Sequence, residues 1–155
     1  MKFLKIILFL ISINDKLIAC NCVGDQTVDS KIRSADVVIS GKVLSFEKFQ
    51  ILSDSLPNGD TIFKMKCRIL LNKIYKSPIN LDDTITIITG IGNGDCGFPF
   101  ENFNKYIIYG KFMNRYFLSG EMVQRYIYTS VCSGTLPFKY KEQKNIKRYM
   151  RKRTT

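Results

Sequence analysis

The chain has 155 residues, a formal net charge of +11 at pH 7 and no histidine. The missing histidine excludes Cys/His zinc sites, histidine general bases and histidine-based catalytic triads. The length fits one domain with a substantial core, and the positive charge attracts acidic surfaces without identifying a partner.

The first 19 residues have the pattern of a secretory signal peptide. Two lysines precede an apolar run over residues 6–13, which is too short to span a bilayer. Cleavage after Ala19 would export the protein with Cys20 as its N-terminal residue, carrying a free α-amine. Residues 17–20 are also typical of a bacterial lipobox, in which Cys20 is lipidated and its amine is acylated. The sequence leaves both alternatives open.

Five cysteines in an exported chain of this size indicate two disulfides and one free thiol. The expected free thiol is Cys67, because it lies in residues 63–69, where apolar and basic residues alternate as in a half-buried strand. An inward-facing cysteine behaves as a small hydrophobic residue. The spacing leaves open how the others pair; they are Cys20, Cys22, Cys96 and Cys132.

A short helix is predicted over residues 25–34, with Asp25 as its possible N-cap. The β-branched run over residues 35–46 then predicts a strand, and its internal Gly41 indicates a bulge or bend. The residues expected on the inner face of that strand are Val37, Ile39 and Val43.

A turn over residues 53–60 is predicted to join this strand to a second one in a long antiparallel hairpin. Further strands are expected over residues 61–75, 83–89, 105–112, 116–119 and 125–131. The glycine-rich loop over residues 90–97 matches neither phosphate-binding motif. Its glycines instead permit unusual backbone angles, so that Cys96 can reach a partner sulfur.

The last part of the chain, residues 139–155, is basic and is expected to form a helix or a tail. Phe138, Ile146 and Met150 are its possible docking residues. Such a run of charge is usually a solvated helix face or a frayed terminus rather than a site for an anionic partner. With five or six strands and two short helices, residues 20–138 are predicted to be mainly β, as an OB-like Greek-key barrel.

Five ordered blocks of sequence carry a resemblance to a known family. They are Cys20–Cys22 (CNC), residues 34–43 (SADVVISGKV), residues 95–100 (DCGFPF), residues 105–110 (KYIIYG) and residues 129–135 (TSVCSGT). Together they resemble the netrin-like N-terminal domain of the tissue inhibitors of metalloproteinases, and most closely its shorter, single-domain exported relatives. The resemblance covers nearly all of the chain after the predicted signal peptide.

The resemblance implies how the cysteines pair. In the family, the first cysteine of the Cys-x-Cys motif bonds to the cysteine before Gly in the central loop, here Cys20 to Cys96. The second bonds to the cysteine after the last strand, here Cys22 to Cys132. Both bridges would fasten the N-terminal segment across the barrel.

The resemblance also implies an inhibitory segment. The family's inhibitors chelate the catalytic zinc of a protease through the α-amine and carbonyl oxygen of the first cysteine, here Cys20. The next residue, here Asn21, points into the specificity pocket, with Cys22 and Val23 as further contacts. The implied partner is a zinc-dependent endopeptidase, which supplies the zinc, and we expect the chain to have no cofactor of its own.

The chain departs from the family in three respects. It has no cysteine near Ser34, where the animal inhibitors begin a third disulfide, and it lacks their C-terminal subdomain. Asn21 is larger and more polar than the Thr or Ser usual at that place.

Two functions follow from this reading: a secreted metalloprotease inhibitor, or a non-inhibitory netrin-like binding module, with or without a lipid anchor. No carboxylate pair, activated nucleophile or metal cluster can be assembled from the polar residues, so we do not expect an enzyme. Export and disulfides argue against a nucleic-acid partner. We expect a monomer that attaches to a membrane only if Cys20 is lipidated.

Overall fold

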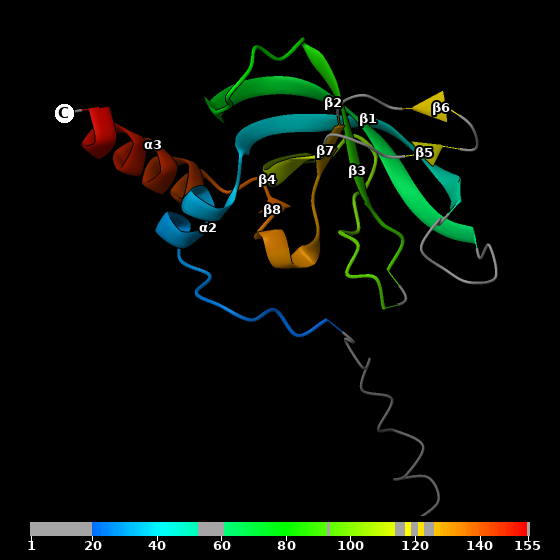
Figure 1. Cartoon of the computed structure of the whole chain (residues 1–155). Coiled ribbons are helices and arrows are strands. Elements are labelled where there is room, and N and C mark those ends of the chain that lie inside the picture. The colour runs from blue at the N-terminus through cyan, green and yellow to red at the C-terminus, as the bar shows by residue number, and fades with distance from the viewer. Residues whose placement is uncertain are drawn as a thin grey trace, which may run out of the picture.

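A computed structural model describes residues 20–52, 61–92, 94–113, 117–118, 121–122 and 126–154. The predicted signal peptide and the predicted turn over residues 53–60 lie outside the described residues. Two helices, a short 3₁₀ turn and a sheet that curves into a barrel make up the described part (Figure 1). No described helix is long and apolar enough to cross a membrane.

Five strands close into a ring. Their order is β1-β2-β3-β7-β4, and β4 pairs again with β1. The β3–β7 pair is parallel and the other pairs of the ring are antiparallel. The ring strands are β1 (Val37–Leu52), β2 (Thr61–Lys76), β3 (Thr84–Gly90), β4 (Lys105–Met113) and β7 (Tyr126–Tyr128). This topology is consistent with an OB-like barrel, so the predicted fold class is confirmed.

Three short strands complete the sheets. One of them, β8 (Leu136–Pro137), extends the main sheet beside β4. The other two, β5 (Phe117–Leu118) and β6 (Glu121–Met122), pair only with each other.

The bend predicted at Gly41 is present. The register between β1 and β2 shifts between Ser40 and Gly41, and β1 curves strongly in Figure 1. A Cβ atom at Gly41 would lie 2.4 Å from Cγ2 of Ile69 and 2.8 Å from the carbonyl oxygen of Leu70. Glycine is therefore needed here because β2 approaches closely, rather than because of an unusual backbone angle.

The barrel interior is a single apolar cluster. It contains the three inner-face residues expected on β1, and the exposed fraction of Cys67 is 1%. Burial raises the pKa of the Cys67 thiol to about 12. The buried members are Val37, Ile39, Val43, Cys67, Ile69, Ile85, Ile87, Phe100, Tyr106, Ile108 and Ile127. The free, inward-facing state predicted for Cys67 is confirmed.

The first helix, α2 (Val28–Ser34), begins later than predicted, and its N-cap is Thr27. The hydroxyl of Thr27 accepts a hydrogen bond from the Ser30 amide at 3.3 Å. Asp25 instead accepts from the backbone amide of Thr27 at 2.9 Å and from its hydroxyl at 2.7 Å. The prediction that Asp25 caps the helix was wrong, because its carboxylate closes a turn two residues before the helix starts.

The second helix, α3 (Tyr140–Thr154), is a packed helix rather than a tail. Ile146 is fully buried, and Phe138 and Met150 pack partly buried beside it, as predicted. This second apolar cluster joins α3 to α2 and to the outer face of the barrel. Its buried members are Ile32, Ala35, Val38, Ile107, Tyr109 and Ile146.

The strand predicted over residues 125–131 was too long. Within the described residues, β7 ends at Tyr128, and a 3₁₀ turn, η1 (Val131–Ser133), follows. Beyond β7 the backbone leaves the sheet: the Val131 amide donates a hydrogen bond to the Cys96 carbonyl oxygen at 3.0 Å instead of to a neighbouring strand. This turn carries Cys132 toward the N-terminal segment.

Candidate functional site

Two disulfides fix the N-terminal segment, Cys20–Val23. Cys20 bonds to Cys96 with 5.4 Å between their Cα atoms, and Cys22 bonds to Cys132 with 5.1 Å. This is the pairing that the family resemblance implies. Alternate residues of a four-residue segment are thus tied to two different loops, which leaves the segment little freedom to move.

The Asp95 carboxylate organises the first anchoring loop. It accepts hydrogen bonds from the backbone amides of Ile91, Gly92 and Gly97 at 3.0, 2.9 and 3.2 Å. The ammonium group of Lys64 on β2 lies 3.1 Å from the same carboxylate. Burial opposes ionisation of Asp95, but the Lys64 contact and the amide bonds outweigh it and hold the carboxyl pKa below its usual range.

The backbone of this loop bends sharply at Cys96. Its φ is +55°, and Gly92 and Gly94 have φ of +91° and +99°. The expectation that glycines permit unusual angles beside Cys96 is therefore confirmed. At Gly97 a Cβ atom would lie 2.1 Å from the carbonyl oxygen of Gly90. The absence of a side chain at Gly97 therefore lets the loop pass close to the end of β3.

The second anchoring loop is η1 and its flanks. Ser130 and Ser133 form a capping box around Cys132, in which the Ser130 amide donates to the Ser133 hydroxyl at 3.1 Å. The Thr129 hydroxyl donates to the carbonyl oxygen of Tyr109 at 2.8 Å and fastens the loop to β4. Since Val131 also donates to Cys96, the two anchoring loops are joined to each other.

The segment presents two side chains to solvent. Asn21 is exposed and Val23 is 94% exposed, whereas Cys20 and Cys22 are half-buried because their sulfur atoms point to the anchoring loops. At 94% exposure, the Val23 side chain packs against little of the described chain. The four residues predicted to contact a protease, Cys20–Val23, are consecutive, and this exposed segment is called the ridge below.

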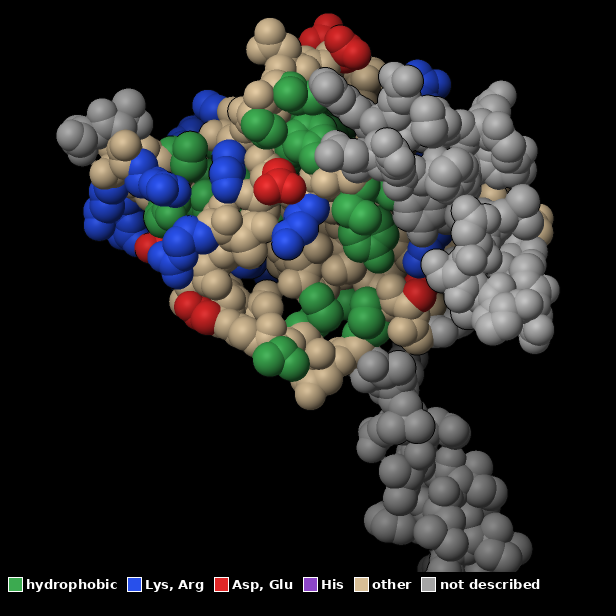
Figure 2. Space-filling model, viewed as in Figure 1, with side chains coloured by type: hydrophobic (Ala, Val, Ile, Leu, Met, Phe, Trp, Pro, Cys, Tyr) green, Lys and Arg blue, Asp and Glu red, His purple; other side chains and the backbone are tan. Residues whose placement is uncertain are grey.

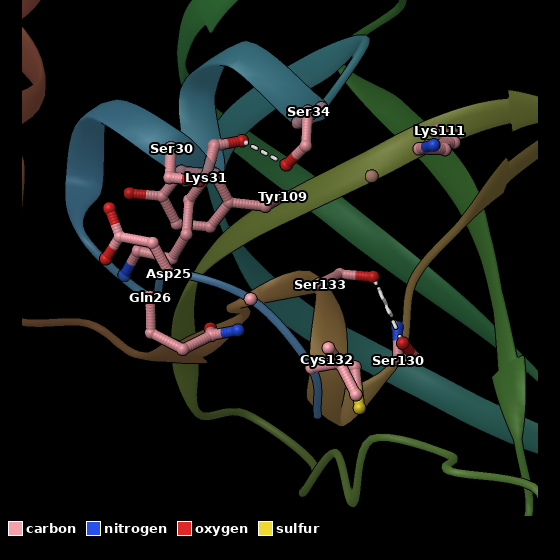
Figure 3. Close-up of a pocket in the computed structure, with 14 residues that line it drawn as sticks. Asp25, Gln26, Ser30, Lys31, Ser34, Tyr109, Lys111, Ser130, Cys132 and Ser133 are labelled. Atoms are coloured by element: carbon pink, nitrogen blue, oxygen red, sulfur yellow. Dashed lines mark hydrogen bonds between the residues drawn. The ribbon is translucent and has the colours of Figure 1, made fainter. Parts of the chain in front are cut away.

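A pocket of about 320 Å³ lies beside this ridge (Figure 3). Its lining includes Val23, Lys31, Tyr109, Lys111 and Cys132. Sequence reasoning missed the pocket, since its walls come from the N-terminal segment, α2, β4 and η1. No local motif marks such a combination, and only the folded topology assembles it.

A network of polar contacts forms behind this pocket. The ammonium group of Lys31 pairs with the Glu142 carboxylate of α3, and the Tyr109 hydroxyl donates to the same carboxylate at 2.8 Å. Burial, together with the bond to Glu142, raises the pKa of Tyr109 above its usual range. The network is therefore a fixed wall of the pocket, with its charges already paired.

No three Cys, Asp or Glu side chains gather as metal ligands in the part of the chain that the structure describes. A scan against protein-family models finds no matching family, and a search of curated proteins finds no matching relative.

Proposed function

We propose that the protein is a secreted inhibitor of zinc-dependent endopeptidases that binds the zinc of its target through Cys20. One observation carries the proposal: two disulfides fix Cys20–Val23 as a ridge, with Asn21 and Val23 facing solvent. A rigid, exposed segment loses little conformational entropy on binding, which favours its use as an inhibitor.

The donor atoms of Cys20 suit a catalytic zinc. After cleavage behind Ala19, the residue offers a free α-amine and a carbonyl oxygen, which can form a five-membered chelate. A catalytic zinc has three protein ligands and an open position, where this pair can displace water. The pKa of an α-amine is roughly 8, so deprotonation on zinc binding costs little near neutral pH. The zinc belongs to the protease, and the inhibitor supplies two of its ligands.

The residues after Cys20 would occupy the protease's substrate groove. Asn21 follows the chelating residue directly and is exposed, so its amide is the group that would enter the specificity pocket. Because an amide needs hydrogen-bond partners when buried, we expect targets whose pocket offers polar groups. Val23 adds an exposed apolar contact one residue beyond the Cys22 bridge.

The test compares the mature protein beginning at Cys20 with a form that carries one extra alanine ahead of it. Both forms are titrated against a panel of zinc endopeptidases, and their thermal unfolding is measured in parallel. We expect the free form to inhibit and the extended form to lose inhibition at an unchanged melting temperature. The extension turns the amine into an amide nitrogen with a delocalised lone pair, and it adds bulk at the zinc.

Two outcomes would contradict the proposal. Equal inhibition by both forms would exclude the Cys20 amine as the ligand. No inhibition by the free form would favour the netrin-like binding module instead. Intact-mass analysis of the naturally processed protein is the accompanying measurement, because acylation of Cys20 in a lipoprotein blocks the same amine.

A further inference from the structure

The outward face of α3 carries positive charge almost without interruption. Every exposed side chain described on this helix is cationic except Tyr140. The cations are Lys141, Lys144, Lys147, Arg148, Arg151, Lys152 and Arg153. The one acidic residue of the helix, Glu142, turns inward onto Lys31 and Tyr109. Figure 2 shows the blue side chains gathered at the end of the molecule where α3 lies.

Four of these cations form a continuous row, called the basic row below. They stand at positions i, i+3, i+4 and i+7 and therefore on one side of the helix: Lys144, Lys147, Arg148 and Arg151. A hollow of about 530 Å³ lies against the row and is lined by all four. A second hollow of about 360 Å³ lies between the row and β2, where Lys73 joins it. The positive surface thus continues from the helix onto the barrel.

The apolar face of α3 is not available to a membrane. Ile146 is fully buried, and Tyr149 and Met150 pack against the domain. A helix that lies on a lipid surface buries its apolar face among the lipids, but here that face is already used by the fold. The remaining face offers charge rather than apolar insertion.

The same face is poorly equipped for nucleic acid. Proteins that bind single strands combine cations with aromatic rings on which bases stack. Tyr140, at the first position of α3, is 73% exposed and lines the same hollow as the basic row, whereas the other ring of the helix, Tyr149, packs against the domain. One ring cannot stack a series of bases, so this face fits better a polyanion whose charges are repeated along its chain.

We propose that the basic row and Lys73 bind a linear sulfated polysaccharide. Repeated sulfate groups match cations repeated along a helix, and the two arginines of the row can form paired hydrogen bonds with oxyanions. The choice of a polysaccharide rests on the proposed export, whereas the docking surface does not depend on protease inhibition. In Figure 1 the C-terminal end of α3 lies far from the blue start of the described chain, so we expect a bound polysaccharide to leave the N-terminal ridge free.

The experiment measures binding of the mature protein to heparin and to desulfated heparin at an ionic strength of about 0.15 M. One variant replaces Lys144, Lys147, Arg148 and Arg151 by glutamine. A matched control replaces two other lysines and two other arginines, all at exposed positions away from α3, and so removes the same amount of charge. These residues are Arg33, Lys48, Arg68 and Lys105. We expect the first variant to lose about tenfold in heparin affinity, as the loss of four exposed ion pairs allows. The control should keep nearly all of it, and desulfated heparin should bind weakly.

Equal losses in the two variants would overturn the proposal, because net charge alone would then explain binding. Tighter binding to an oligonucleotide of matched length, or to anionic lipid vesicles, would overturn the choice of polysaccharide. If the fourfold variant melts at a lower temperature, the pair Lys147→Gln and Arg151→Gln replaces it. The Ala-extended form should still bind heparin, so a failure here is distinguishable from a failure of the proposed inhibition.

Discussion

Gly41 shows how one absent side chain sets the path of a strand. A Cβ atom there would overlap Ile69 and the Leu70 carbonyl group, so any side chain must push β2 away from β1. We expect Gly41→Val to lower the free energy of unfolding by about 1 to 3 kcal/mol, the usual cost of overpacking. Thermal or denaturant unfolding measures this change.

The control for this substitution is Arg68→Val, at an exposed position on β2. Valine suits a strand, and the side chain at this position is exposed, so the stability of the protein should change little. A melting temperature for Gly41→Val equal to that of the wild type would show that β1 and β2 do not approach each other as described.

At the scale of elements, a largely buried ion pair links α3 to α2. The side chains of Lys31 and Glu142 are only 12% and 13% exposed, and Tyr109 donates to the same carboxylate. Glu142→Gln would leave the Lys31 ammonium without its counter-charge in a poorly solvated place. We expect a loss of about 1 to 3 kcal/mol in the free energy of unfolding, measured by denaturant titration.

A second ion pair provides the comparison. Lys66 and Glu47 lie 3.2 Å apart on β2 and β1, with side chains 39% and 66% exposed. Glu47→Gln should cost less than about 1 kcal/mol, because water screens an exposed pair. If the two glutamine variants unfold alike, the contact between α2 and α3 contributes nothing specific.

Elements with a strong local period were predictable from the sequence. The strand expected over residues 61–75 is Thr61–Lys76, where alternation of apolar and polar residues records one buried face. The strand expected over residues 105–112 is Lys105–Met113, where a continuous apolar run is buried on both faces. The end of β7 and the start of α2 were not predictable in the same way. Both are set by specific hydrogen bonds, one from Val131 to Cys96 and one from Ser30 to Thr27.

At the scale of the whole molecule, α3 is part of the packing although the sequence placed a boundary at residue 138. Its Ile146 completes a cluster that includes Val38 and Ile107 on the outer face of the barrel. A chain that ends after Lys139 would expose this cluster. We expect a much lower melting temperature and a less cooperative transition, since deletion of a buried isoleucine alone costs about 2 to 5 kcal/mol.

The control for this truncation ends after Met150. It keeps Ile146 and Glu142 and removes only the last positive turn, so its melting temperature should stay near that of the full chain. Equal melting of both truncated forms and the intact protein would show that the barrel does not need α3.

Long-range organisation was the least accessible from sequence. The barrel was expected from strand number and from Gly41, but its closing strand β7 has only three residues and no distinctive pattern of its own. The disulfide pairing came from family resemblance, since spacing permits several connectivities. The pocket beside Val23 was not foreseen, because four separate elements build it. Local sequence patterns indicate which face of a strand or helix is buried, but they do not indicate which distant element covers that face.

The two disulfides also cross along the chain, which bears on how the protein is made. A chain that emerges amino end first exposes Cys20, Cys22 and Cys67 to an oxidant before Cys96 and Cys132 have appeared. Any early pair among the first three is non-native and must be undone by thiolate attack. Once both native bridges have formed, Cys67 is the one thiol left, and its burial in the barrel, with its pKa raised to about 12, leaves almost no thiolate to attack them. The closed barrel therefore protects the finished bridges from exchange within the same chain.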